Sequence, residues 1–204
     1  MRVRLRLMDP RTDLGPRIIV TGRPGAGKTR LARELASHLR RDLIRLDPLI
    51  TDEHSRRKPE EDIAPALSAV ARQEEWVLEG MGQDIPQHAW KRATTVIWLD
   101  LRRGILIWRL FKRAFPKKLA RLPVWGGIRY TLVGHRAERA RLERYVRENA
   151  PRSSHVIRMS STKQYRELIG GLPGPTGGRT RVIRGKASRR LSPPEDTLQG
   201  GMDP

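Results

Sequence analysis

Short apolar runs that alternate with helical patterns fill the middle of the chain. Five such runs are expected to form buried strands, at 17–21, 43–46, 75–79, 94–99 and 155–159. Helical patterns fall at about 29–39, 63–73, 86–92, 103–114, 135–149 and 162–169. Strands separated by helices predict a five-stranded parallel sheet covered on both faces, which is the three-layer α/β/α class.

The two ends of the chain lack this pattern. Residues 1–14 alternate Arg with apolar residues and then reach the turn signal Asp9-Pro10, so they form an N-terminal extension, either an edge strand or a loose leader. From residue 173 onward Gly, Pro, Ser and Arg dominate. Such a composition buries too little apolar surface to offset chain entropy, so 173–204 is predicted to be a disordered basic tail. The domain itself is then 15–172.

A glycine-rich octapeptide joins the first predicted strand to the first predicted helix. Residues 22–29 read GRPGAGKT and match G-x-x-x-x-G-K-[ST] at every fixed position. Glycines let successive N–H groups point at phosphate oxygens, and the following helix adds the positive end of its dipole. The motif predicts a phosphate loop that binds ATP or a close relative together with Mg²⁺.

Each polar residue of this loop has an expected task. Lys28 is predicted to be catalytic, neutralising the β- and γ-phosphates, and the Thr29 hydroxyl is predicted to ligate Mg²⁺. The residues predicted to bind the nucleotide are Gly22, Gly25, Ala26, Gly27, Lys28, Thr29 and Arg30.

Three acidic residues follow or close predicted strands, where open α/β sheets bind their ligands. Glu79 closes the third strand and is the candidate for holding Mg²⁺, directly or through water. Asp47 follows the second strand and is a candidate catalytic residue that accepts a hydrogen bond or a proton from an acceptor hydroxyl. Asp100 follows the fourth strand. Each of the three is also open to the simpler interpretation of a strand-end or capping carboxylate.

Positive charge is concentrated late in the domain. The formal charge is +20, and residues 102–147 hold fourteen Lys and Arg against two Glu, a net +12. Such a stretch favours an anionic partner. Within it, Arg109 and Arg113 lie four apart on one predicted helix face, where they are candidate catalytic residues for phosphoryl transfer. A solvated basic helix face is the alternative.

Other classes of chemistry find no support in the sequence. Cysteine is absent, which excludes disulfides and thiolate sites and fits a cytoplasmic protein. No run approaches the roughly 18 apolar residues of a membrane-spanning helix, and no apolar segment follows the basic start as in a secretory signal. The five histidines show no metal-ligand spacing.

Beyond the phosphate loop, several segments resemble the bacterial DNA topology modulation proteins, which are adenylate-kinase-related small P-loop kinases. The resemblance spans about 17–170 and is carried by Arg45-Leu46-Asp47, by 76–80 (WVLEG), and by 95–101 (TVIWLDL) running into 106–113 (LIWRLFKR). The family typically has Asp-Gly where this chain has Glu79-Gly80.

The resemblance implies a nucleoside-monophosphate-kinase type of fold. That fold is a five-stranded parallel sheet with a substrate-binding insertion at about 48–72 and a lid at about 115–130. Arg109 and Arg113 match the spacing of the two arginines that begin the lid of adenylate kinases. The implied reaction is transfer of the γ-phosphate of Mg·ATP to a small acceptor, such as a nucleoside monophosphate.

Two other functions remain open at this point. One is a nucleic-acid-binding NTPase or regulator that grips phosphate backbone through the basic region 102–147 and the basic tail, although no helix-turn-helix, zinc finger or RNA-binding aromatic motif is recognisable. The other is a membrane-surface contact through the basic helix expected over 103–121. The kinase is the favoured hypothesis.

Overall fold

The computed structural model describes residues 14–52, 56–59, 61–63, 65, 68, 72–101, 104, 135–174 and 181–183. Several sequence predictions therefore lie outside the described residues. These are nearly all of the extension 1–14, most of the helices expected at 63–73 and 103–114, the lid at 115–130, and most of the tail 173–204.

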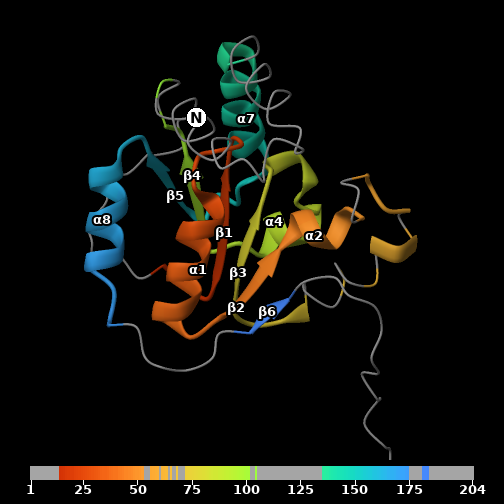
Figure 1. Cartoon of the computed structure of the whole chain (residues 1–204), viewed down its shortest axis with the longest axis horizontal. Helices are drawn as coiled ribbons and strands as arrows, with labels where there is room; N and C mark the ends of the chain where they lie inside the picture. Colours follow the sequence, from red (N-terminus) through yellow and green to blue (C-terminus); the bar gives the residue numbers. More distant parts are fainter. Residues whose placement is uncertain are drawn as a thin grey trace, which may run out of the picture.

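A parallel sheet forms the centre of the protein (Figure 1). Its strands, in the spatial order β5-β4-β1-β3-β2-β6, pair in parallel throughout. Their bounds are β1 (Arg17–Gly22), β2 (Asp42–Arg45), β3 (Trp76–Gly80), β4 (Thr95–Leu99), β5 (His155–Met159) and β6 (Val182–Ile183). The first five confirm the predicted strands to within one or two residues.

The sixth strand corrects the prediction of a five-stranded sheet. Leu43 and Ile44 of β2 pair with Val182 and Ile183, and Leu43 N donates to Arg181 O at 2.9 Å. These residues lie inside the segment predicted to be disordered. Two adjacent β-branched residues among Gly, Pro and Arg are too short a run to predict a strand from the sequence. Val182 and Ile183 form a strand because they pair with the open edge of β2.

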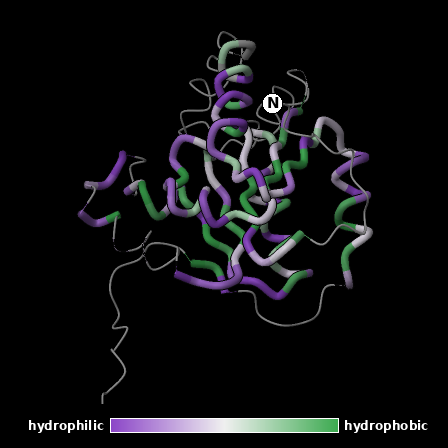
Figure 2. The backbone as a smooth tube through the Cα atoms, turned by 180° about the vertical axis from the view of Figure 1, so that it is seen from behind, coloured by the Kyte–Doolittle hydropathy of each residue, from purple (hydrophilic) through white to green (hydrophobic). Residues whose placement is uncertain are grey.

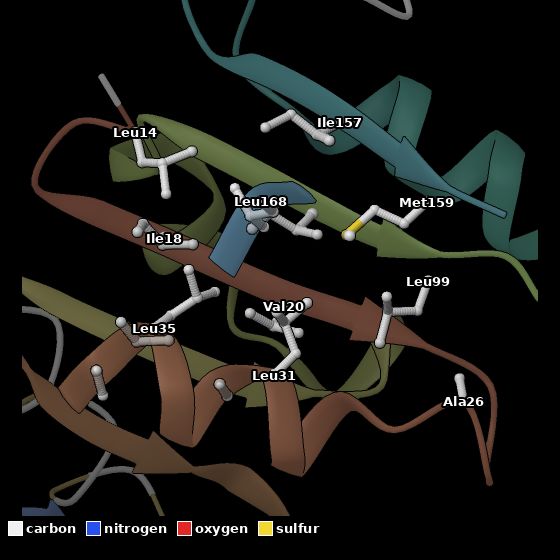
Figure 3. Close-up of a cluster of buried hydrophobic side chains, with 14 of the residues drawn as sticks. Leu14, Ile18, Val20, Ala26, Leu31, Leu35, Leu99, Ile157, Met159 and Leu168 are labelled. Atoms are coloured by element: carbon white, nitrogen blue, oxygen red, sulfur yellow. The ribbon is translucent and has the colours of Figure 1, made fainter. Parts of the chain in front are cut away.

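Two helices cover one face of the sheet. They are α1 (Lys28–Leu39) and α8 (Thr162–Gly170), on one side of the sheet in Figure 1. Figure 3 shows Leu31 and Leu35 of α1 meeting Ile18 and Val20 of β1, with Leu168 of α8 in the same cluster. All of these side chains are at most 2% exposed. Their i, i+4 spacing in α1 is what predicted the helix.

Shorter helices and one long helix cover the other face. They are α2 (Leu46–Ile50), the 3-10 turn η1 (Gly82–Asp84), α4 (Gln87–Arg92) and α7 (His135–Asn149). Their apolar residues pack with the alternate strand residues, such as Ile19, Leu78 and Val96. Figure 2 shows the hydrophobic positions gathered along the inner strands and hydrophilic positions along the outer helices. The three-layer α/β/α class is thus confirmed.

The start of α2 differs from the prediction. The second strand was expected over 43–46 and to end at Asp47-Pro48, but the strand ends at Arg45, and Leu46, Asp47 and Pro48 open a helix. Pro48 is its third residue, and the first N–H groups of a helix have no partner inside it. Proline is therefore tolerated there. Asp47 consequently lies on the first turn of α2, at the carboxyl end of β2.

Candidate active site around the phosphate loop

The phosphate loop runs from the end of β1 to the first turn of α1. Gly25 and Gly27 have φ angles of 77° and 94°, in the left-handed region that glycine adopts readily. A hydrogen bond from Ala26 N to Arg23 O at 3.2 Å closes the turn that runs from Arg23 to Ala26. Gly27 caps α1 without a side-chain bond, so the first N–H groups of this helix remain as donors for an anion.

Gly22 is required by a close approach to β4. A Cβ at this position would lie 2.7 Å from the carbonyl oxygen of Leu99 and 3.0 Å from its Cβ. The carboxyl end of β4 therefore packs directly against the first residue of the loop, and any side chain at Gly22 would push the loop away from the sheet.

Lys28 is held at the centre of the loop, only 9% exposed. Its Nζ donates to the carbonyl oxygen of Arg23 at 3.3 Å. Burial lowers the pKa of Lys28 from its ordinary value, and the carboxylates of Glu79, Asp47 and Asp84 counteract that shift. A phosphate would replace a single carbonyl contact with a charged partner, so the lysine is arranged to receive an anion.

Three carboxylates thus lie around Lys28, from three different elements. Glu79 comes from β3, Asp47 from α2 and Asp84 from η1. The first two were predicted, and the structure brings both to Lys28. Asp84 was missed by sequence reasoning. Asp84 lies two residues after the Gly80–Gly82 break that ends the third strand. Nothing in this spacing ties Asp84 to the phosphate loop.

The environment of Asp84 differs from that of the other two. Burial raises its pKa and the nearby Asp47 adds to the increase, while Arg57 and Lys28 oppose it. Arg57 Nη1 lies 3.8 Å from Asp84 Oδ1. Asp47 and Asp84 are therefore close enough for their charges to interact with each other and with Lys28.

Glu79 is fully enclosed, at 1% exposed, and is paired with the neighbouring strand. Arg45 is its register partner on β2, and Arg45 Nε donates to Glu79 Oε2 at 3.4 Å. The pair fixes the carboxylate at the carboxyl end of β3. On its other side, Glu79 pairs in register with Val20 of β1. Val20 lies two residues before Gly22, the first residue of the loop.

The last two predicted loop residues point to different places. Thr29 is partly buried in the first turn of α1, next to Lys28. Arg30 is exposed, and its Nε donates to Glu34 Oε1 at 3.0 Å while its guanidinium lies 5.4 Å from the ring centre of Tyr165. Its side chain is therefore engaged on the α8 side of α1, and only its backbone N–H belongs to the loop.

The donors near the loop suit a hard cation. A hydroxyl and carboxylates are the oxygen ligands that Mg²⁺ takes, and it is commonly held by one or two protein groups together with phosphates. Among the residues that the structure describes, no three His, Asp or Glu side chains cluster closely enough to bind a metal by themselves. Thr29 and Glu79 fit the smaller set that phosphates would complete.

A pocket opens beside the first half of the loop. It is lined by Gly22, Arg23, Pro24, Met81, Gly82, Gln83, Arg141, Leu142 and Tyr145. One wall is the phosphate loop, the second is the turn after β3, and the third is α7, which stands at the carboxyl end of the sheet (Figure 1). The lining thus mixes polar residue types with apolar ones.

Gly82 allows the second and third walls to approach each other. A Cβ on it would lie 2.8 Å from Leu142 Cδ1 and 3.4 Å from Tyr145 Cδ1. Tyr145 also packs edge-on against Trp90, with ring centroids 5.8 Å apart. Burial raises the pKa of Tyr145, and Asp84 raises it further, so this phenol stays protonated next to the carboxylate.

Asp100 follows β4, whose last residue Leu99 pairs with Gly22 of the loop, and it is almost wholly buried. Its carboxylate is bonded by arginines from three elements. Arg23 belongs to the phosphate loop, Arg139 to α7 and Arg158 to β5. Because its partners come from three other elements, Asp100 does not act only as a cap on its own strand.

The predicted lid arginines are not part of this description. Arg109, Arg113 and the segment 115–130 lie outside the described residues, as does most of the basic region 102–147. In the part of the chain that is described, no helix is long and apolar enough to cross a membrane.

Two solved structures similar to this one are kinases. A shikimate kinase from Acinetobacter baumannii in complex with shikimate is 19% identical, over 76% of this chain and 89% of its own, with a TM-score of 0.46. A gluconokinase from Sinorhizobium meliloti 1021 is 16% identical, over 78% of this chain and 93% of its own, with a TM-score of 0.44. Similarity at this level carries no argument about activity.

The family comparison is more direct. No curated protein matches the chain. The sequence profile of the AAA domain family matches residues 18–126, which is more than half of the 204 residues. The matched segment contains the phosphate loop and both Glu79 and Asp100. This chain therefore belongs to the AAA domain family, with a nucleotide-binding P-loop at its centre.

Proposed function

We propose that this protein is an ATP-dependent phosphotransferase that transfers the γ-phosphoryl group of Mg·ATP to a small acceptor. The observation that carries the proposal is the position of Lys28. It is buried in the phosphate loop and approached by Asp47, Glu79 and Asp84, beside a pocket lined by Arg23 and Arg141. A loop that only held nucleotide would not require a second, mixed polar and apolar pocket next to it.

The nucleotide occupies the loop and the start of α1. Backbone N–H groups from Gly25 to Thr29 contact the phosphates, and Lys28 exchanges the Arg23 carbonyl for the β- and γ-phosphate oxygens. Thr29 and Glu79 would hold Mg²⁺, Glu79 directly or through water. When bound, the cation neutralises charge on the phosphate oxygens.

The acceptor occupies the pocket between the loop, Met81–Gln83 and α7. This side of the loop begins at Gly22 and Arg23, away from the α1 N-terminus that takes the phosphates of the nucleotide. An acceptor oxygen attacks the γ-phosphorus, and the bond from that phosphorus to the bridging oxygen breaks, so ADP leaves with the bridging oxygen. A hydroxyl acceptor gives its proton to Asp47; a phosphate acceptor such as a nucleoside monophosphate needs no base, and Asp47 then only positions it.

Charge stabilisation of the transferred group is assigned to arginines. Arg109 and Arg113 would close over the γ-phosphoryl group and exclude water, as expected from their spacing in the sequence. The resemblance to the DNA topology modulation proteins, described as adenylate-kinase-related small kinases, supports the same class of reaction.

Formation of ADP is the test. Purified protein is incubated with Mg·ATP and a panel of nucleoside monophosphates, nucleosides, small alcohols and sugar-like acids. Strong stimulation by one acceptor is expected. Only background ADP formation with every acceptor would overturn the assignment of a small acceptor.

The same assay separates the nucleic-acid alternative. Stimulation by DNA or RNA, with an affinity that falls steeply and linearly in log–log form with salt concentration, would favour an NTPase that grips a phosphate backbone. A shallow salt dependence together with stimulation by one small acceptor favours the kinase.

A further inference from the structure

Asp100 is bonded far beyond what a buried carboxylate requires. Its side chain is 2% exposed, and it receives Arg139 Nε at 3.0 Å on both oxygens and Arg139 Nη2 at 2.9 Å. Arg158 Nε donates at 2.9 Å and Arg158 Nη2 donates as well, while Arg23 Nη2 lies 3.6 Å away. Three guanidinium groups against one carboxylate leave a net charge of +2.

Arg158 donates to only one oxygen of the carboxylate, Oδ2, and Oδ1 accepts a hydrogen bond from Arg139 Nε. Arg158 bonds Asp100 through two nitrogens, and its guanidinium lies 4.8 Å from the ring centre of Trp98 on the neighbouring strand. A third positive group, Arg23 at 3.6 Å, adds repulsion among like charges, so the stability of the fold gains little from it. The convergence of arginines from the loop, α7 and β5 on one carboxylate therefore calls for a reason beyond the burial of Asp100.

Arg23 and Arg139 come from two walls of the pocket. Arg23 is the second residue of the phosphate loop, and its Nη2 also donates to Leu101 O at 2.9 Å. Arg139 lies on α7, three residues before Leu142, so both side chains are on one face of the helix. Asp100 thus joins the loop and α7 at one point, beside Gly22, where β4 meets the loop.

We propose that Asp100 is a positioning residue for phosphoryl transfer, which acts through Arg139 and Arg23. It fixes α7 against the phosphate loop, and so sets the distance between the acceptor wall and the nucleotide. It also holds positive charge in a rigid arrangement next to the loop. This inference rests on the proposed function, because it takes the pocket as the acceptor site.

Positioning of this kind has a large effect on rate and a small one on fold. A guanidinium fork bound to both oxygens of a carboxylate has one geometry, which an ammonium cannot reproduce. A displacement of about 1 Å at a reacting group lowers turnover on the order of 100-fold. The rate of ADP formation is therefore the informative measurement.

The experiment is a double-mutant cycle with Asp100→Asn and Arg139→Lys. Each single variant is expected to lower kcat by about 10- to 100-fold with the Kd for Mg·ATP within about twofold, and the double variant is expected to be no slower than the slower single. Asp100→Glu, which keeps the charge, should recover part of kcat. Arg144→Lys on the exposed side of α7 is the control, and should match the wild-type protein.

Each outcome distinguishes a positioning role of Asp100 from a purely structural one. Losses that multiply in the double variant, or an equal loss in Arg144→Lys, would overturn the positioning role. Variants that change only the melting temperature would do the same, because they would show a structural role alone. If Asp100→Asn does not fold, Asp100→Glu with Arg139→Lys completes the same cycle. A wild-type protein that neither binds nucleotide nor forms ADP would overturn the proposed function, and this inference with it.

Discussion

The two sides of the candidate site are built in opposite ways. The nucleotide side is almost one continuous segment within Gly22 to Thr29, in which the glycines, Lys28 and Thr29 have tasks that their residue types alone suggest. The acceptor side is assembled from the same loop's first residues, the turn after β3 and the middle of α7, more than 100 residues along the chain. The first side is encoded locally, and the second exists only after folding.

This difference has a physical origin. Phosphate recognition by backbone N–H groups needs only a strand, a turn and a helix, which are neighbours in sequence. An acceptor pocket needs walls facing each other across a space, and those walls come from separate crossovers of the parallel sheet. The consequence is that substitutions on the two sides should affect different kinetic constants.

The largest effect is expected on the nucleotide side. Lys28→Ala removes the cation proposed to contact the β- and γ-phosphates, and should lower Mg·ATP-dependent turnover by about 1,000-fold or more. The melting temperature should not fall, because burial disfavours the charged lysine in the fold. Lys91→Ala, exposed on α4, is the matched control. Unchanged turnover in Lys28→Ala would remove the phosphate loop from the reaction.

A smaller loss is expected at Glu79. Glu79→Gln keeps the shape of the side chain but leaves Arg45 without its charge partner and weakens Mg²⁺ binding. Turnover should fall by about 10- to 100-fold, and the loss should be partly recovered at high Mg²⁺ concentration. Glu75→Gln, just before the same strand and exposed, is the control. A loss that does not respond to Mg²⁺ would assign Glu79 to structure only.

The acceptor side should respond in KM rather than in nucleotide affinity. Gly82→Ala brings a methyl group to 2.8 Å from Leu142 Cδ1, and moving that flexible side chain changes the pocket at modest cost. The KM for the acceptor should rise several-fold, with the Kd for ATP unchanged. Gly170→Ala, where nothing lies within 4 Å, is the control. An equal change in ATP affinity would erase the distinction between the two sides.

The smallest effect on activity is expected far from both sides. Val182→Asp places an unpaired carboxylate on the strand that covers β2, next to the core cluster. A loss of about 1–2 kcal/mol would lower the melting temperature by roughly 2–8 °C, with turnover unchanged. Arg181→Gln, whose backbone rather than side chain meets β2, serves for comparison. An unaltered melting temperature in Val182→Asp would support the disordered tail that the sequence predicts.

Sequence reasoning reached the fold because its signals are local. Apolar runs marked the first five strands, and the i, i+4 pattern of Leu31 and Leu35 marked α1. It missed β6 because Val182 and Ile183 acquire their structure from the edge of β2. It misjudged the start of α2 because Pro48 was read as a stop, although proline is compatible with a first helical turn.

The same reasoning explains what was found and missed in the site. Lys28, Asp47, Glu79 and Asp100 were identifiable because each follows or lies in a predicted strand or motif. Asp84 was missed, and the ion-pair partners of both Asp84 and Asp100 are predicted by no spacing. Arg57 faces Asp84 from the insertion, and Arg139 reaches Asp100 from α7. Long-range ion pairs of this kind follow from the packing of elements, and the packing is not written in any one segment.

The fate of the γ-phosphoryl group tests the account most directly. ATP labelled at the γ-position is incubated with the protein, Mg²⁺ and the acceptor that most stimulates ADP formation, and the label is followed into products. A phosphotransferase places the label in the acceptor, in equal amount to ADP. Label found only in inorganic phosphate, with the acceptor unmodified, would contradict phosphoryl transfer and identify the protein as an NTPase.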